Sequence, residues 1–462
     1  MTGVAGHHLM WTLRFFPMLW IATVSLPMAS RLSAAISDGD SIQKALDAHP
    51  GAIISLPAGD YTISQPIRFT GKNSGLCGPG RIIQANPKAA ILEITQCDDV
   101  QIRNLTLLRP EGKMESSEPG IHVTKSRNVV LSNIEVFDNR SDLASILIEN
   151  CGLLQISDCV IQNYSRIAID DRTAKSDYGY AFNCINGAWI IVRNTKNMII
   201  KGNRIIETVM IPSPELKAKY HLGDFVKKNA QKGRVIRQQD WDAAYVNNWH
   251  QGSALQVTSP EVSDSVQILD NYIENAAQGI DIHADHVIVA QNIVNNAFIG
   301  MKAMHGSRNV LIIGNQFIKN DLWSIGLMPG TNSHDASASI GPAKPALGAN
   351  IDGHSIISNN IISDFGYGNA HWMWEGSGTP LKFDSAPLPG QPPLRNVLVQ
   401  GNVIYNTGRD QVIVDGVPKI EPPRYKYAVT ISGGDGAPQG LHFLNNLLDP
   451  GTAGVSGAEL TP

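Results

Sequence analysis

The sequence has few cysteines and little excess charge, and both deficits limit the kinds of protein it can be. Its five cysteines among 462 residues form no CxxC pair, and no histidine lies at zinc-ligand spacing. The sequence therefore predicts no metal site and assigns no disulfide. The formal net charge is −4 at pH 7, which does not suggest a nucleic acid as partner. The glycine-rich stretch 71–83 lacks the strand-to-helix setting of a phosphate-binding loop, and we expect no cofactor.

The first 35 residues lack acidic side chains altogether. Arg14 and Arg31 are their only formal positive charges, and Phe15 to Ala29 is an apolar run broken by two prolines. Small residues follow in SRLSAA, so residues 1–35 are predicted to be a secretory signal peptide, with the mature chain in the periplasm or outside the cell. The alternative is an uncleaved anchor, although the run is short and broken for a membrane span.

The central part of the chain lacks a helical 3.6-residue period and repeats a shorter phrase instead. Between 264 and 330 an apolar residue opens a β-rich run, and Asn follows five places later. The three copies pair Val266 with Asn271, Val287 with Asn292, and Val310 with Asn315, at spacings of 21 and 23 residues. A fixed period of about 20–50 residues made of short strands and turns indicates a solenoid, and this unit is typical of one coil of a parallel β-helix.

The position that holds this asparagine, here called the asparagine slot, can be followed outward in both directions. Asn fills it again at Asn203, Asn360, Asn402 and Asn446, whereas upstream it holds Leu105, Ile134 and Cys159. The gaps between slots range from 21 to 68 residues, and we interpret the longer ones as hiding a degenerate coil or an insertion. Asn at a repeated inward position predicts a ladder in which each side-chain amide bonds to the next coil's.

With this pattern the chain resembles the right-handed parallel β-helix proteins of the pectin-lyase-like superfamily, over residues 36–449. The resemblance implies an all-β fold, a single-stranded right-handed parallel β-helix (a solenoid) of roughly a dozen coils in one domain. It also implies an N-terminal capping helix over the open end, and we expect Ser41 to cap a helix at 42–46. Residues 450–462 form a C-terminal tail.

Three long segments interrupt the rhythm, at about 211–252, 329–353 and 366–395. Insertions in a solenoid lie on its lateral face and commonly form the binding surface. The first segment begins with a cluster of basic residues and ends with a cluster of aromatic ones, and the third contains two tryptophans. The faces of aromatic side chains can stack on sugar rings. We interpret nine residues as substrate contacts: Lys228, Arg234, Arg237, Trp241, Tyr245, Trp249, His250, Trp372 and Trp374. The alternative is that the aromatic residues only pin the loops to the helix body.

The candidate catalytic residues lie in the central repeat. Strand alternation points Asp281 and His283 outward from one coil and Lys302 outward from the next. Stacked coils are ~4.8 Å apart, so Asp281 and Lys302 are expected side by side, with His305 in the following turn. The alternative is a solvated face with one ordinary salt bridge, which is our interpretation of His286 and Arg308.

These residue types suit chemistry on a uronic-acid polymer. Removal of the C5 proton beside a carboxylate needs a base, a cation that neutralises the carboxylate, and an acid. His283 or His305 suits the acid–base role, and Lys302 can neutralise or, if desolvated, act as base. Glycoside hydrolysis needs two carboxylates facing the bond, for which Asp281 and Asp285 are the candidates, although Asp285 lies in a turn.

The run Gly279 to Asp285, GIDIHAD, is similar to the Asp-Pro-His-Asp motif of periplasmic mannuronan C5-epimerases. The resemblance implies acid–base catalysis by His283 with Asp281 as its companion carboxylate. Ile282 replaces the proline of the motif, and Ala284 is an extra residue before the second acid. The Asn-Lys-Ser signature of β-helix alginate lyases is missing around Lys302.

The sequence therefore predicts a secreted or periplasmic polysaccharide lyase or C5-epimerase for a uronic-acid polymer. A glycoside hydrolase on the same scaffold and a non-catalytic carbohydrate-binding or cell-surface β-helix remain as alternatives. We expect an anionic polysaccharide as partner, no nucleic acid, and no stable membrane span once the leader is removed.

Overall fold

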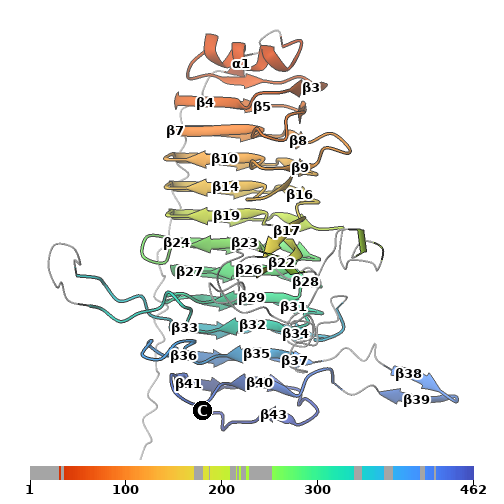
Figure 1. Ribbon diagram of the computed structural model, residues 1–462, viewed down its shortest axis with the longest axis vertical. Coiled ribbons are helices and arrows are strands. Elements are labelled where there is room, and N and C mark those ends of the chain that lie inside the picture. The colour runs from red at the N-terminus through yellow and green to blue at the C-terminus, as the bar shows by residue number, and fades with distance from the viewer. Residues whose placement is uncertain are drawn as a thin grey trace, which may run out of the picture.

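The computed structural model describes residues 31–32, 36–170, 180–186, 188–208, 215, 218–219, 225–227, 252–337, 346–368, 378–405, 411–420 and 423–462. Their strands stack one above another along a single long axis, with α1 over the N-terminal end (Figure 1). Neighbouring strands in the two large sheets are parallel, and each coil contributes in turn to three faces. The predicted parallel β-helix is confirmed.

The first two faces belong to one 24-stranded sheet, and β7 (Leu92–Arg103) is long enough to serve both. The first face also holds β4 (Ile67–Lys72), β10 (Ile121–Thr124), β14 (Ile146–Glu149), β19 (Ile190–Arg193), β23 (Ser253–Thr258), β26 (Gln278–Ile282), β29 (Ile299–Ala303), β32 (Trp323–Leu327), β35 (Thr379–Phe383), β40 (Tyr427–Ile431) and β43 (Gly454–Ser456). The second face also holds β1 (Arg31–Leu32), β2 (Ile53–Ser55), β5 (Gly75–Cys77), β11 (Arg127–Ser132), β15 (Gly152–Ser157), β20 (Lys196–Lys201), β24 (Asp264–Leu269), β27 (Asp285–Ala290), β30 (Leu311–Ile313), β33 (Gly353–Ser358), β36 (Arg395–Gln400) and β41 (Gln439–Leu444).

The third face is a 12-stranded sheet, in agreement with the expected dozen coils. It comprises β3 (Asp60–Ile63), β6 (Arg81–Gln84), β8 (Thr106–Leu108), β12 (Glu135–Phe137), β16 (Val160–Gln162), β21 (Arg204–Ile206), β25 (Tyr272–Glu274), β28 (Ile293–Asn295), β31 (Gln316–Ile318), β34 (Ile361–Ser363), β37 (Val403–Tyr405) and β42 (Leu447–Leu448). Smaller sheets are made by β9 (Glu115–Ser116) with β13 (Arg140–Ser141), by β17 (Arg166–Asp170) with β18 (Tyr180–Asn186) and β22 (Phe225–Lys227), and by β38 (Gln411–Val414) with β39 (Val417–Ile420).

The N-terminal capping helix is confirmed, but it starts earlier than expected. Helix α1 spans Gly39–Ala48, and its N-cap is Asp38, whose side chain accepts a hydrogen bond from the Ser41 N–H. The Ser41 hydroxyl bonds back toward the N-cap backbone, so Ser41 is the N3 partner in a capping box. The prediction that Ser41 is the cap is therefore wrong, because Asp38 supplies a carboxylate three residues earlier.

The asparagine ladder is confirmed. Each amide Nδ2 lies 2.9 Å from the Oδ1 of the next coil's asparagine, from Asn203 through Asn446. The same Oδ1 also accepts a backbone N–H, as Asn292 Oδ1 does from Asn271, and Nδ2 donates again to a carbonyl. From Asn203 to Asn402 the buried amides are thus paired inside an aliphatic core, where an unpaired amide would be costly.

The long gaps between asparagine slots do not hide degenerate coils. β16 pairs directly with β21, and β21 pairs directly with β25, although the slots of these coils are 44 and 68 residues apart. Of the two alternatives for these gaps, the degenerate coil is excluded and the insertion is confirmed, because the extra residues lie within single coils. The third expected insertion, 366–395, contains β35 of the first face, so only the parts on either side of this strand leave the ladder.

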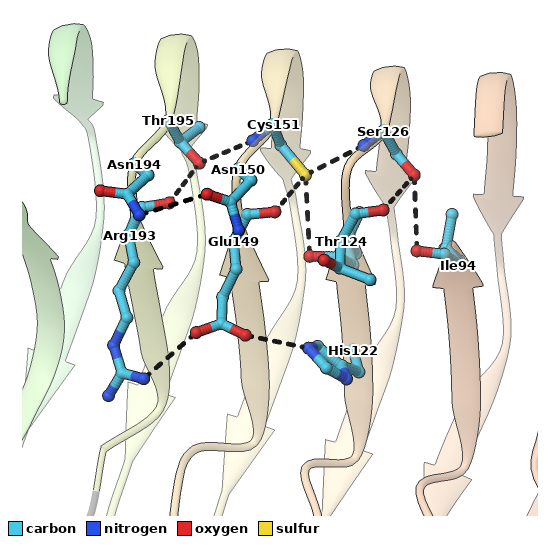
Figure 2. Close-up of polar contacts among 11 residues, drawn as sticks. Ile94, His122, Thr124, Ser126, Glu149, Asn150, Cys151, Arg193, Asn194 and Thr195 are labelled. Carbon is cyan, nitrogen blue, oxygen red and sulfur yellow. Dashed lines mark hydrogen bonds and ion pairs between the residues drawn. The ribbon is translucent and has the colours of Figure 1, made fainter. Parts of the chain in front are cut away.

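A second ladder, which the sequence analysis did not predict, follows the corner between the first and second faces. The backbone N–H of one coil donates to a hydroxyl or thiol of the next, from Cys97 to Ser126, Ser126 to Cys151, Cys151 to Thr195, and Thr195 to Ser263. Figure 2 shows the two middle steps, from Ser126 to Cys151 and from Cys151 to Thr195. We call this the corner ladder. Cys151 is therefore a structural free thiol, as is the buried Cys159 in the asparagine slot.

Within the described ranges, no helix has the length and apolar character needed to cross a membrane.

Candidate active site

The first face presents one outward row of side chains across successive coils. Gln256 of β23 is paired in register with Asp281 of β26, Asp281 with Lys302 of β29, and Lys302 with Gly326 of β32. The predicted adjacency of Asp281 and Lys302 is therefore confirmed. Ile280 and Ile282 on either side of Asp281 are fully buried in the core, as the alternation required.

Asp281 points away from the core but is covered, with only 3% of its surface exposed. Its Oδ2 lies 3.5 Å from Lys302 Nζ and 3.3 Å from both Ser253 Oγ and Gln256 Nε2. Its Oδ1 lies 2.9 Å from His283 Nε2. Burial opposes ionisation, yet the pKa of Asp281 lies well below its usual range because His283 and Lys302 together outweigh the desolvation.

His283 and His305 pack against each other beside this carboxylate. Their ring centroids are 4.8 Å apart and the rings are nearly perpendicular. His283 Nε2 faces Asp281 Oδ1, and its Nδ1 lies 3.4 Å from Thr258 Oγ1. The cluster therefore contains one carboxylate, one ammonium and two imidazoles, all predicted from the sequence.

His305 is held by the loop that follows β32. The Asn332 N–H donates to His305 Nδ1 at 3.4 Å, and Asn350 Nδ2 donates to the His305 carbonyl at 3.1 Å. Gly330 lies against the ring so closely that a β-carbon there would be 2.0 Å from Nδ1. Burial, reinforced by His283 and Lys302, lowers the pKa of His305 to about 4, so the ring is neutral at pH 7 with its proton on Nε2.

Asp352 is a further residue of this region, which the sequence analysis missed. It is 1% exposed, and its Oδ1 accepts the N–H groups of Gly306 at 2.8 Å and Ser307 at 2.9 Å. Its Oδ2 accepts the Ser333 hydroxyl. Asp352 thus ties the turn that carries His305 to the loop that contacts the His305 ring. Burial raises the pKa of Asp352 to about 6 despite these hydrogen bonds.

Asp285 is not available as a second catalytic carboxylate. Its Oδ2 lies 2.6 Å from Arg308 Nε, and its Oδ1 accepts from Asn309 Nδ2 at 2.7 Å. Asp264, Asp285 and His286 do come within reach of one metal ion, since His286 Nδ1 lies 3.2 Å from an oxygen of each carboxylate. The Arg308 guanidinium already neutralises Asp285, which agrees with the structural interpretation of His286 and Arg308.

The nine predicted substrate contacts lie outside the described residues. They are Lys228, Arg234, Arg237, Trp241, Tyr245, Trp249, His250, Trp372 and Trp374. Their interpretation as substrate contacts stays a prediction.

Comparison with known proteins places the fold. Residues 89–317 match the family described as "Right handed beta helix region". A comparison with curated proteins found no match. Among solved structures, the catalytic domain of Agl-KA is similar with a TM-score of 0.54 at 12% identity, over 95% of this chain and 69% of that one.

Two further structures are similar at lower scores. A hyperthermoactive exopolygalacturonase from Thermotoga maritima has a TM-score of 0.45 at 10% identity, over 88% of this chain and 87% of its own. The A-module of the Azotobacter vinelandii mannuronan C-5 epimerase AlgE6 has a TM-score of 0.42 at 14% identity, over 93% and 97%. At these identities the likeness concerns the fold, which carbohydrate-active enzymes share. The chain therefore folds as a right-handed parallel β-helix.

Proposed function

We propose that this protein is a polysaccharide lyase or C5-epimerase that acts on a uronic-acid polymer through Asp281, His283, Lys302 and His305. The observation that carries the proposal is the clustering of one ammonium, one carboxylate and two imidazoles on a single outward face. We further propose that it acts outside the cytoplasm, where the predicted signal peptide would deliver it.

Lys302 is suited to neutralise the substrate carboxylate. Its side chain is 15% exposed and its ammonium carries three N–H donors, so contact with Asp281 leaves capacity for a substrate oxygen. Neutralising that carboxylate lowers the cost of forming a carbanion at the adjacent C5 carbon. Asp281 Oδ2, 3.5 Å away, holds the Lys302 ammonium in place on this face.

The two imidazoles supply the two proton positions that the chemistry needs. His283 is assigned the role of the base that takes the C5 proton, and neutral His305 carries a proton on Nε2 that it can donate. In a lyase this proton would go to the O4 leaving group as the C4–O bond breaks. In an epimerase the His305 proton would instead be delivered to C5, on the face opposite the one from which His283 removed the original proton.

The geometry supports hydrolysis less well. A retaining glycosidase needs carboxyl groups about 5–5.5 Å apart and an inverting one about 6.5–9.5 Å. Asp384 follows β35, three coils beyond Asp281 on the same face, which corresponds to ~14 Å at ~4.8 Å per coil. Asp285 is held by Arg308 and Asn309. Neither Asp384 nor Asp285 is therefore suited to act as the second carboxylate beside Asp281.

A product screen tests the proposal. The protein is incubated with alginate, pectate and neutral glycans, and three products are measured: ultraviolet-absorbing unsaturated ends, reducing ends, and the ratio of C5 epimers. We expect unsaturated ends or a changed epimer ratio on at least one polyuronate. Reducing ends without unsaturation would replace the proposal by a glycoside hydrolase. Binding without any product would replace it by a carbohydrate-binding protein.

A further inference from the structure

A pocket of about 460 Å³ lies next to His305, outside the proposed catalytic cluster. One wall is the turn Ser259 to Val262 after β23, and the other is the loop Thr331 to His334 after β32. Two coils separate these segments; the corner after β26 has only two residues, His283 and Ala284, and the corner after β29 spans residues 304–310. Glu261 Oε1 and His334 Nε2 approach to 3.7 Å across the gap.

Among the residues that the structure describes, the lining is rich in hydroxyl and amide groups and includes no lysine or arginine. Asn194, which Figure 2 shows beside Asn150 at the end of β19, forms one edge, and Asn332 and Asn350 form another. Sugar hydroxyls both donate and accept hydrogen bonds, as these groups do. Glu261 is the one carboxylate among these described lining residues, so an anionic sugar would meet a like charge there.

The pocket shares a wall with the proposed active site. Asn332, which lines the pocket, donates its N–H to His305, and Asn350 Nδ2 bonds both to the Asn332 carbonyl at 2.9 Å and to the His305 carbonyl. One polymer can therefore reach both places at once. The volume of the pocket, about 460 Å³, lies within the range of ligand pockets, about 300–1,000 Å³.

We propose that this pocket is a subsite for a neutral, hydroxyl-rich sugar residue, so that the substrate combines neutral sugars with uronic acids. The statement about the substrate rests on the proposed function, whereas binding of a neutral sugar here does not. The positions of the charges distinguish the two sugar residues. Lys302 would bind the carboxylate of the uronic acid, and the pocket beyond His305 would bind a sugar residue without a carboxylate.

The test fills the pocket and measures binding rather than turnover. Val262 is 41% exposed at the pocket wall, so Val262→Trp adds bulk without opening the core. The matched control is Val417→Trp, at a 64% exposed position on the β38–β39 hairpin that projects from the solenoid (Figure 1). Calorimetric titration uses neutral trisaccharides of glucose, mannose and galactose, and trimers of uronic acid.

We expect at least one neutral trisaccharide to bind the unmodified protein. Val262→Trp should weaken that binding about tenfold or more, while Val417→Trp leaves it unchanged. His334→Ala, which removes a polar group and adds no bulk, should weaken it several-fold, since one hydrogen bond contributes about 0.5–1.5 kcal/mol.

Two results would overturn the subsite. One is that no neutral trisaccharide binds, and the other is that Val262→Trp, with an unchanged melting temperature, leaves binding intact. The failures of the two proposals are distinguishable. If Val262→Trp loses neutral-sugar binding but the unmodified protein does not react with any polyuronate, the subsite stands and the proposed function fails. If the protein reacts with a polyuronate but neutral-sugar binding is absent or unaffected by Val262→Trp, the proposed function stands and the subsite fails.

Discussion

At the scale of single residues, the burial of Asp281 decides which substitutions are informative. Its charge is 3% exposed and is balanced by Lys302 at 3.5 Å. Removing one partner of a buried ion pair costs about 3–5 kcal/mol because the other charge is left uncompensated. Lys302→Ala would therefore lower both turnover and stability, and a cleaner test moves a catalytic group without removing a charge.

Gly330 offers that test. Gly330→Ala places a methyl group where the His305 ring now lies, 2.0 Å from Nδ1, so the ring must move. Misplacement of a catalytic group by about 1 Å can lower turnover about 100-fold. We expect a loss of that order, measured on the substrate that the product screen identifies, together with a changed His305 imidazole signal by NMR.

The matched control lies in the same loop. A β-carbon at Gly348 would meet no atom within 4 Å, so Gly348→Ala should leave both turnover and the His305 signal unchanged. Equal turnover in the two variants would mean that His305 takes no part in the reaction.

Asp352 gives a prediction for pH. Its pKa is raised to about 6 in the folded protein from an unfolded value near 3.8, so between these limits the folded state holds a proton that the unfolded state has lost. The contribution of Asp352 to stability is therefore fully present below pH ~4 and is lost as pH rises through ~6, by at most about 3 kcal/mol.

Asp352→Asn keeps the shape and removes the titration. We expect urea unfolding at pH 4.5, 5.5, 6.5 and 7.5 to show that the unmodified protein loses stability relative to this variant as pH rises. Parallel stability curves for the two proteins would contradict the buried, protonatable Asp352.

At the scale of elements, the ladders explain how one repeated coil stays in register. In Asn292→Ala, the N–H and Nδ2 of Asn271 lose the acceptor they share, inside the core. Each buried donor left without an acceptor costs about 1–3 kcal/mol. We expect a loss of a few kcal/mol in the free energy of unfolding, measured by denaturant titration.

Asn446 provides the comparison. It accepts the same pair of bonds from Asn402, but it is only partly buried at the end of the ladder, so water can replace the lost acceptor. Asn446→Ala should cost clearly less than Asn292→Ala. An equal loss of unfolding free energy in the two variants would show that the contribution of the ladder to stability does not depend on its burial.

The same element explains how much of the fold could be predicted from the sequence. The asparagine slot marks one point in each coil, because an inward amide is stable only when the next coil supplies its partner. The residue before the slot adopts a left-handed conformation in coil after coil, for example Asp270 at φ 55° and Asn359 at φ 54°, which Asn, Asp and Gly tolerate best.

The corner ladder was readable by the same method. Ser126, Cys151, Thr195, Ser263, Ser307 and Asp352 each lie three residues before the residue that opens the repeated phrase. Following the phrase upstream by three positions would have found Asp352. Its bond to Ser333 could not be predicted, because the 25-residue path of the loop between β32 and β33 is not periodic.

The sequence predicts which residues of the candidate site are neighbours on adjacent strands, but it does not predict how deeply they are buried. Alternation along β26 and β29 identifies the neighbours Asp281 and Lys302, since side chains of adjacent parallel strands stack. What covers them depends on loops from other coils, such as Gly330 and Asn332 over His305. Such contacts join residues about 25 positions apart and leave no local pattern.

At the scale of the whole molecule, the first face concentrates the chemistry. The catalytic cluster occupies β26 and β29, and the pocket lies at the adjoining corner between the turn after β23 and the loop after β32. Upstream on the same face, Glu149 contacts both His122 and Arg193 at 3.2 Å (Figure 2). A polymer lying along the stacked coils would meet these groups in sequence, which a repeat scaffold favours.

The central claim is that the protein removes the C5 proton of a uronic acid. The most direct measurement uses alginate and pectate that carry deuterium at C5, and follows the release of deuterium to water. We predict release from at least one polymer at the rate of turnover, and its loss in His283→Ala. Retention of the C5 deuterium in both polymers, whether or not the chains are shortened, would contradict the account.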